Sequence, residues 1–153
     1  MKIAIVSDTH NNLVNFKKAI DWANKNDIRM ILHCGDIQTQ EIIDESRKTF
    51  KGKIEFVKGN GDYDLDLPPK MELEIDSKKI VFCHFPEIAK EQALSGKFDV
   101  VFYGHTHKPW EEVLNNCRLA NPGELAGQLF KPTFAVYDTN ANLLELKILD
   151  NLK

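Results

Sequence analysis

Runs of apolar residues divide the first third of the chain into alternating strands and helices. Residues 2–7 are mostly apolar, which is typical of a strand buried on both faces, and apolar side chains then recur at helical spacing from Leu13 to Ala23. We predict two further strands over residues 29–33 and 54–57, with a helix over residues 40–50 between them. This repetition of β-α units indicates a sheet whose first strands are parallel.

The pattern changes in the second part of the chain, where apolar and acidic residues alternate over residues 71–75. This alternation predicts a hairpin with residues 80–83 that has one solvent-facing side. A short helix over residues 88–94 precedes a buried strand at residues 98–103. Further strands are predicted at residues 111–114, 118–120, 133–137 and 144–149. Because hairpins now follow β-α units, we expect mixed parallel and antiparallel strands.

Length and composition place the chain among ordinary globular domains. Its 153 residues are 42% hydrophobic and 28% charged, and no repeat or Pro/Gly/Ser linker divides them, so residues 1–153 are expected to form one domain. A domain of this size buries enough surface to fold without a metal, so any metal it binds is expected to serve function. A (β/α)8 barrel, which takes about 250 residues, is disfavoured.

Charge and cysteine content exclude several classes of partner. The net charge is −3 and the basic residues are scattered, so a long nucleic acid is not expected. The apolar run at the N-terminus ends at Asp8 and is too short for a secretion signal or a membrane span, which predicts a cytoplasmic protein. The three cysteines lack C-x-x-C spacing, so we expect buried free thiols.

Residues able to bind metal follow the ends of the predicted strands. These residues are Asp8, His10, Asp36, Asn60, His84, His105 and His107. Ligands of open α/β sheets collect at the carboxyl ends of the strands, so these side chains are expected to converge there.

The residue types narrow the chemistry of this site. Aspartate, histidine and asparagine side chains suit Mn, Fe, Zn, Ni or Co better than Ca. Seven such groups exceed what one ion can use if water and substrate also bind, so we predict two divalent ions that share a carboxylate, with Asp36 as the bridge. The resulting positive site favours a phosphate-like substrate.

The blocks that carry these residues resemble the metal motifs of the calcineurin-like metallophosphoesterases. In chain order the blocks are Ser7-Asp8-Thr9-His10, Gly35-Asp36, Gly59-Asn60-Gly61-Asp62, His84 and Gly104-His105-Thr106-His107. Asn121-Pro122-Gly123 is similar to a further motif of the small phosphodiesterase branch found in archaea and bacteria. Any one block is a weak signal, whereas all of them in this order are specific.

The resemblance implies a fold, a ligand set and a reaction. The fold would be a four-layer αββα sandwich of two mixed sheets. Asp8, His10, Asp36 and His107 would hold one ion, and Asp36, Asn60, His84 and His105 the other. A hydroxide bridging the ions would attack phosphorus in line, which makes the chain a metal-dependent phosphodiesterase acting on a small phosphodiester or phosphate ester. Asp36, Asn60 and His84 are the expected catalytic residues, and Mn²⁺ is the ion expected first.

Two departures from the family pattern affect catalysis. Many members have a histidine as general acid after the motif asparagine, whereas this chain has Gly61, so we expect modest activity and a preference for good leaving groups. Phe85 and Asn11 stand where glycine is usual, which predicts a narrower cleft. Asn11, Tyr63 and Lys108 flank the motifs and are candidate substrate contacts.

Other interpretations of these residues stay open at this point. A lone aspartate after a strand, such as Asp8 or Asp36, is more often a helix N-cap than a ligand, and only the other motifs reverse that expectation. His33 is expected in the core or on the surface rather than as a ligand, and a supporting position behind the ligands is the alternative. The main rival function is a weak or inactive metal-binding scaffold, because the retromer subunit of this superfamily serves in protein–protein interaction. The substrate, the native metal and the oligomeric state are open, and a homo-oligomer is allowed for.

Overall fold

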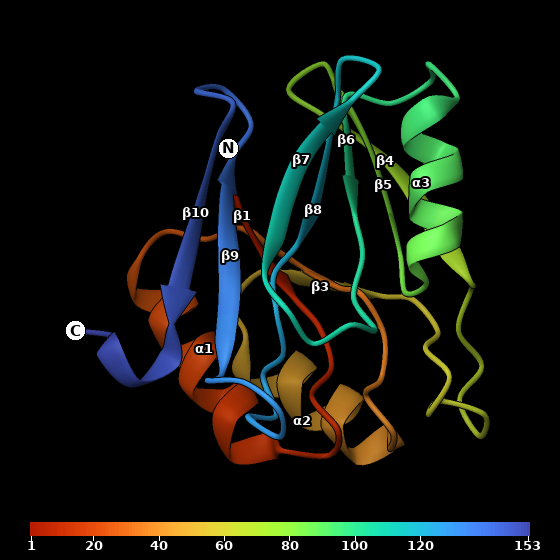
Figure 1. The fold of residues 1–153 in the computed structure, drawn as a ribbon. Helices are drawn as coiled ribbons and strands as arrows, with labels where there is room; N and C mark the ends of the chain where they lie inside the picture. Colours follow the sequence, from red (N-terminus) through yellow and green to blue (C-terminus); the bar gives the residue numbers. More distant parts are fainter.

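Two five-stranded sheets face each other, with helices on both outer sides, in the computed structural model of residues 1–153. Figure 1 shows α1 and α2 beside one sheet and α3 beside the other. The layers therefore follow the order helix, sheet, sheet, helix. This is the predicted four-layer αββα sandwich of two mixed sheets.

The first sheet has the strand order β10-β9-β1-β2-β3. Its parallel centre consists of β1 (Lys2–Val6), β2 (Met30–His33) and β3 (Lys53–Phe56). The strands β9 (Thr133–Asp138) and β10 (Leu143–Ile148) add to β1 in antiparallel fashion, with Ile3 opposite Tyr137.

The second sheet has the order β4-β5-β6-β8-β7. The strands β4 (Lys70–Ile75) and β5 (Lys78–Cys83) form the predicted hairpin, and β5, β6 (Val100–Phe102) and β8 (Cys117–Asn121) are parallel. The edge strand β7 (Trp110–Leu114) pairs with β8 in antiparallel fashion.

Three apolar cores hold these layers together. The helices α1 (Leu13–Lys25) and α2 (Gln40–Thr49) pack on the first sheet, and Ile3 and Ile5 point the other way, between the two sheets. The helix α3 (Pro86–Leu94) packs on the outer face of the second sheet. Because side chains alternate along a buried strand, one strand contributes to two cores, which explains its continuous apolar sequence.

The sequence locates every helix and strand, and the structure differs from it mainly at two ends. The strand β6 is shorter than residues 98–103, because only Val100 to Phe102 pair with both β5 and β8. Leu149 leaves β10 and begins the 3-10 turn η1 (Leu149–Asn151), where it is buried in the core beneath α1. All three cysteines are buried and free, as predicted. No helix is both long and apolar enough to cross a membrane.

Candidate metal centre

The loops that follow five strands meet at one edge of the sandwich and carry the seven predicted ligands. Backbone hydrogen bonds join the first two of these loops. The Asp8 N–H donates to the carbonyl of Gly35, and the His10 N–H donates to the carbonyl of Asp36, each at 2.9 Å. The ends of β1 and β2 are therefore fixed relative to each other before any side chain contributes.

Five of the predicted ligands have left-handed backbone conformations. Their φ angles are 53° at Asp8, 45° at His10, 59° at Asp36, 71° at His105 and 64° at His107. Residues other than glycine adopt this region rarely and at an energetic cost, and such residues gather at functional sites. The backbone of this edge is thus shaped to direct side chains toward one place.

A first group of ligand atoms comes from Asp8, His10, Asp36 and His107. One atom from each of these residues lies within 4.8 Å of the others. The Nε2 atoms of His10 and His107 are 3.1 Å apart, and Asp8 Oδ1 lies 3.2 Å from the Nε2 of His107. This group is the one that the resemblance assigns to one ion.

A second group lies on the other side of Asp36. His84 Nε2 is 3.4 Å from Asp36 Oδ2 and 2.9 Å from Asn60 Oδ1. His105 Nδ1 lies 3.0 Å from the same Asn60 oxygen and 3.2 Å from His84 Nε2. Asp36 is therefore the carboxylate that contacts histidines of both groups, as expected of a bridging ligand.

In the first group one acceptor atom lacks a donor, and in the second group acceptor atoms face each other. Asp8 Oδ1 is buried and accepts no hydrogen bond. His84 donates its Nδ1–H to the carbonyl of Cys34 at 2.8 Å, so its Nε2 lone pair faces the Asn60 oxygen, which also only accepts. Buried acceptors normally find a donor, and a cation satisfies such facing lone pairs. The residues present therefore fit divalent metal ions.

The charges of the site perturb its pKa values. Burial alone would raise the pKa of Asp8, but the neighbouring imidazoles of His10 and His107 and the Ser7 hydroxyl hold it well below its usual range. The interaction with Asp8, opposed by burial, raises the pKa of His107 to about 9. These opposite shifts have one cause, because a carboxylate and the imidazoles beside it stabilise each other's charged forms.

Asp62 fixes the two loops that present Asp36 and Asn60. Its side chain is fully buried and accepts the backbone N–H of Asp36 at 2.8 Å, of Gln38 at 2.7 Å and of Gly59 at 2.8 Å. These three bonds hold the loop that carries Asp36 against the loop that carries Asn60.

The backbone of Gly104 passes very close to the end of β1. A Cβ atom there would lie 2.0 Å from Ser7 Oγ and 2.6 Å from Asp8 Oδ2. The same Asp8 oxygen accepts the N–H of His105 at 3.0 Å. Only glycine allows this approach, so it joins the loop of the two late histidines to Asp8.

His33, the last residue of β2, is fully buried and contacts no member of either group. Its Nδ1 accepts the Gly35 N–H at 3.2 Å, so its Nε2–H donates to the Thr9 hydroxyl at 2.7 Å. Burial lowers the pKa of His33 to about 3. The imidazole is thus a neutral link between the loops after β1 and β2.

Sequence reasoning missed Glu124, which follows the Asn121-Pro122-Gly123 motif. This carboxylate is fully buried, and its Oε2 accepts the Nδ1–H of His107 at 2.6 Å. The only signal in the sequence was an acidic residue beside a motif in a loop, and loops rarely bury a charge without a partner.

The three candidate substrate contacts lie outside both groups. Asn11 follows His10 and accepts a hydrogen bond from the Thr39 hydroxyl at 2.9 Å. Tyr63 is 78% exposed. Lys108 lies over the Trp110 ring at 5.7 Å, and both residues line a cleft of about 410 Å³. These residues are thus available to a ligand rather than engaged in the centre.

Phe85 lies beside the second group. Its ring centroid lies 5.1 Å from that of His84 and 5.2 Å from that of His105. The phenyl ring therefore covers one side of these imidazoles, where a glycine would leave open space.

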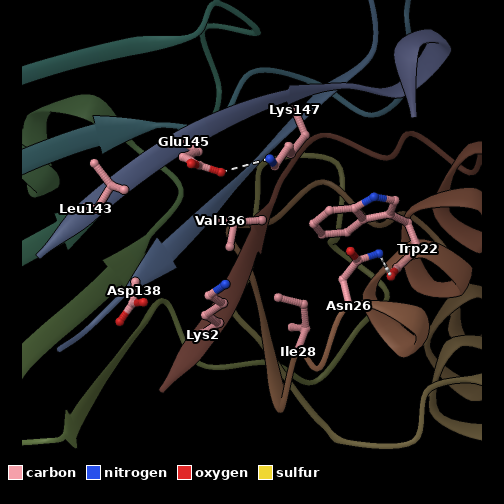
Figure 2. Close-up of a pocket in the computed structure, with 9 residues that line it drawn as sticks. All are labelled: Lys2, Trp22, Asn26, Ile28, Val136, Asp138, Leu143, Glu145 and Lys147. Atoms are coloured by element: carbon pink, nitrogen blue, oxygen red, sulfur yellow. Dashed lines mark hydrogen bonds and ion pairs between the residues drawn. The ribbon is translucent and has the colours of Figure 1, made fainter. Parts of the chain in front are cut away.

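A separate cavity of about 170 Å³ lies between α1 and the strands β1, β9 and β10 (Figure 2). It is lined by Lys2 at the start of β1, by Asp138 at the end of β9 and by Trp22 of α1. Lys147 lies over the Trp22 ring and pairs with Glu145 at 2.8 Å. None of the seven ligand residues lines this cavity, so it is not part of the metal centre.

The fold agrees with comparisons to known proteins. Residues 1–142 match the family model of the calcineurin-like phosphoesterase superfamily domain. The chain therefore belongs to the calcineurin-like phosphoesterase superfamily, and its class is that of metal-dependent phosphoesterases, hydrolases that act on phosphate esters.

Individual relatives support this membership. A phosphodiesterase of Methanocaldococcus jannaschii is 33% identical over 91% of this chain and 93% of its own length. The probable metallophosphoesterase YsnB of Bacillus subtilis is 28% identical over 82% of this chain and 75% of its own.

Solved structures have the same architecture. One, described as a novel archaeal phosphodiesterase, has a TM-score of 0.88 at 30% identity and covers 97% of this chain and 99% of its own. YfcE, a phosphoesterase from E. coli, has a TM-score of 0.77 at 18% identity, with coverage of 100% and 96%. Vps29 of Chaetomium thermophilum has a TM-score of 0.76 at 17% identity, with coverage of 97% and 92%, and supports the fold alone.

Proposed function

We propose that the protein hydrolyses a small phosphodiester at a centre of two divalent metal ions. The observation that carries this proposal is the pair of ligand groups joined by Asp36, whose carboxylate lies 3.5 Å from His10 Nε2 and 3.4 Å from His84 Nε2. The similarity to a phosphodiesterase of M. jannaschii over nearly the whole length of both chains supports the choice of a diester.

The residues present divide into two ligand sets. Asp8, His10, Asp36 and His107 would hold one ion, and Asp36, Asn60, His84 and His105 the other. When bound, the two ions would supply a hydroxide nucleophile for in-line attack and neutralise the negative charge that develops on the phosphoryl oxygens. We infer Mn²⁺ as the first ion to test, because oxygen and imidazole ligands without thiolates suit it.

The protein's own contribution is the orientation of these side chains. Asp36 Oδ1 accepts the Gly61 N–H at 2.8 Å, which holds the carboxylate against the loop that carries Asn60. The Cys34 carbonyl holds the imidazole of His84 through its Nδ1–H. Both side chains are thereby placed before a substrate arrives, which reduces the entropic part of the barrier.

No side chain at position 61 can protonate a leaving group. Gly61 lies beside Asp36, and the rings of His84 and His105 are engaged in the second ligand set. A positioned acid is worth about 10²- to 10⁴-fold in rate. We therefore propose that the enzyme acts best on esters whose leaving group departs without a proton.

The direct test is hydrolysis of bis(p-nitrophenyl) phosphate by metal-stripped protein, with and without added Mn²⁺. We expect turnover only with metal, and its loss in Asp36→Ala. Lys147→Ala is a control for the general effect of a substitution, because Lys147 lines a cavity to which none of the seven ligand residues contributes. Absence of turnover in protein that binds two ions would contradict the proposal and favour a binding role.

A further inference from the structure

We propose that Glu124 is a positioning residue that orients His107 toward the first metal ion and anchors the following loop to the same imidazole. This inference rests on the proposed function. Glu124 is not one of the seven ligands; it lies in the loop that follows β8 and contacts His107.

His107 carries a proton on Nδ1, the ring nitrogen that faces Glu124. A carboxylate can only accept, so the 2.6 Å contact between Glu124 Oε2 and His107 Nδ1 requires a proton on Nδ1. A metal ligand needs a free lone pair on the other nitrogen. The Nε2 of His107 lies 3.2 Å from Asp8 Oδ1 and 3.1 Å from His10 Nε2, inside the first ligand group. Glu124 therefore selects the tautomer that can bind an ion there.

The other carboxylate oxygen of Glu124 binds the loop that follows it. Glu124 Oε1 accepts the backbone N–H of Leu129 at 2.6 Å and of Phe130 at 2.7 Å. The residue is fully buried, so its three donors replace the water that the charge would otherwise hold. One carboxylate thus joins a ligand histidine to the loop of residues 125–130.

A third observation places this loop directly on the site. The N–H of Leu125 donates to the carbonyl of Ser7, and the N–H of Ala126 donates to the carbonyl of Asp8, each at 3.0 Å. The loop is therefore fixed at one end to the strand end that carries Asp8 and further along to Glu124. This arrangement prevents the ring of His107 from rotating away while no ion is bound.

Glu124→Gln separates the two tasks of the side chain. The glutamine oxygen can still accept from Leu129 and Phe130, and its amide NH₂ would then face His107 Nδ1 as a donor. The imidazole would have to place its proton on Nε2, where an ion must bind. Binding at the first ligand set should weaken about 10- to 100-fold, while the set of Asn60, His84 and His105 keeps its affinity.

The experiment is calorimetric titration of metal-stripped protein with Mn²⁺, comparing wild type, Glu124→Gln and the exposed control Glu145→Gln. We expect two binding events in wild type and control, and one weakened event in Glu124→Gln. A purely structural role would shift both events or neither. Glu124→Gln with both affinities equal to wild type would overturn the inference alone, whereas a wild type that binds no Mn²⁺ would overturn the proposed function first.

A second measurement needs no variant to fold. In Zn²⁺-loaded wild type labelled with ¹⁵N-histidine, the Nδ1–H of His107 should give a strongly downfield, slowly exchanging proton resonance, as expected of a short bond to a carboxylate. A His107 that carries no proton on Nδ1 in the loaded protein would contradict the proposed orientation.

Discussion

The buried imidazole of His33 should make the stability of the metal-free protein fall in mild acid. His33 is fully enclosed between the rings of Phe16 and Phe56, and it joins the Thr9 hydroxyl to the Gly35 N–H. Burial lowers its pKa to about 3 from the value of 6.5 that the unfolded chain has. Below pH 6.5 the unfolded chain therefore binds a proton that the native protein does not.

The size of the effect follows from this difference in pKa. Between about pH 6.5 and pH 3, each decrease of one pH unit lowers the folding equilibrium constant about tenfold because of this one group. From pH 7 to pH 5 the free energy of unfolding should fall by about 2 kcal/mol because of His33. The contribution is fully present above pH 6.5, and it is lost progressively as the pH falls.

Urea unfolding of metal-stripped wild type and His33→Gln at both pH values isolates the contribution of His33 to the change in unfolding free energy. Glutamine does not titrate, and other groups titrate in both proteins, so their contributions largely cancel in the difference. Wild type should lose about 2 kcal/mol more than His33→Gln between pH 7 and pH 5. An equal loss in the two proteins would refute the argument that His33 is held neutral by burial.

Three further substitutions test the construction of the site. Gly104→Ala places a Cβ 2.6 Å from Asp8 Oδ2, so kcat/KM with Mn²⁺ should fall by about 10²-fold or more. Gly61→Ala is the control, because a Cβ at position 61 meets no atom closer than 3.3 Å. Equal activities of the two variants would contradict the reasoning. Gly61→His should raise kcat at least about tenfold on alkyl esters and little on p-nitrophenyl esters, and an equal change for both would exclude an acid role. Asp62→Asn places an amide NH₂, a donor, opposite backbone N–H groups, so the free energy of unfolding measured with urea should fall by about 1–3 kcal/mol. An unchanged value would show that the three bonds contribute nothing.

The ends of the strands were the most predictable part of the structure. Apolar runs such as residues 2–7 and 29–33 end shortly before a loop that contains polar residues, because buried strands must leave the core before their polar loops begin. Since those polar residues include Asp8 and Asp36, locating the strands also located the ligands. The edge of the sheet then brought them together, as Asp8, His10, Asp36 and His107 demonstrate.

The supporting residues were less predictable, because their roles depend on contacts between distant loops. Glu124 acts on His107 only when the loop after β8 folds back over the end of β1. His33 contacts Thr9, and Asp62 contacts the N–H of Asp36, although the partners are far apart in the sequence. A local sequence pattern therefore does not predict these contacts. The left-handed backbone of Asp8 and His10 is equally hidden, since both residue types also occupy ordinary turns.

The central claim is a centre of two metal ions joined by Asp36, and a titration of activity tests it most directly. Metal-stripped protein at a concentration far above the dissociation constants should be given Mn²⁺ in small steps while the hydrolysis of bis(p-nitrophenyl) phosphate is measured. The account predicts that the rate rises until two equivalents of Mn²⁺ per chain are present and then stays constant. Full activity at one equivalent, or activity that is independent of added metal, would contradict it.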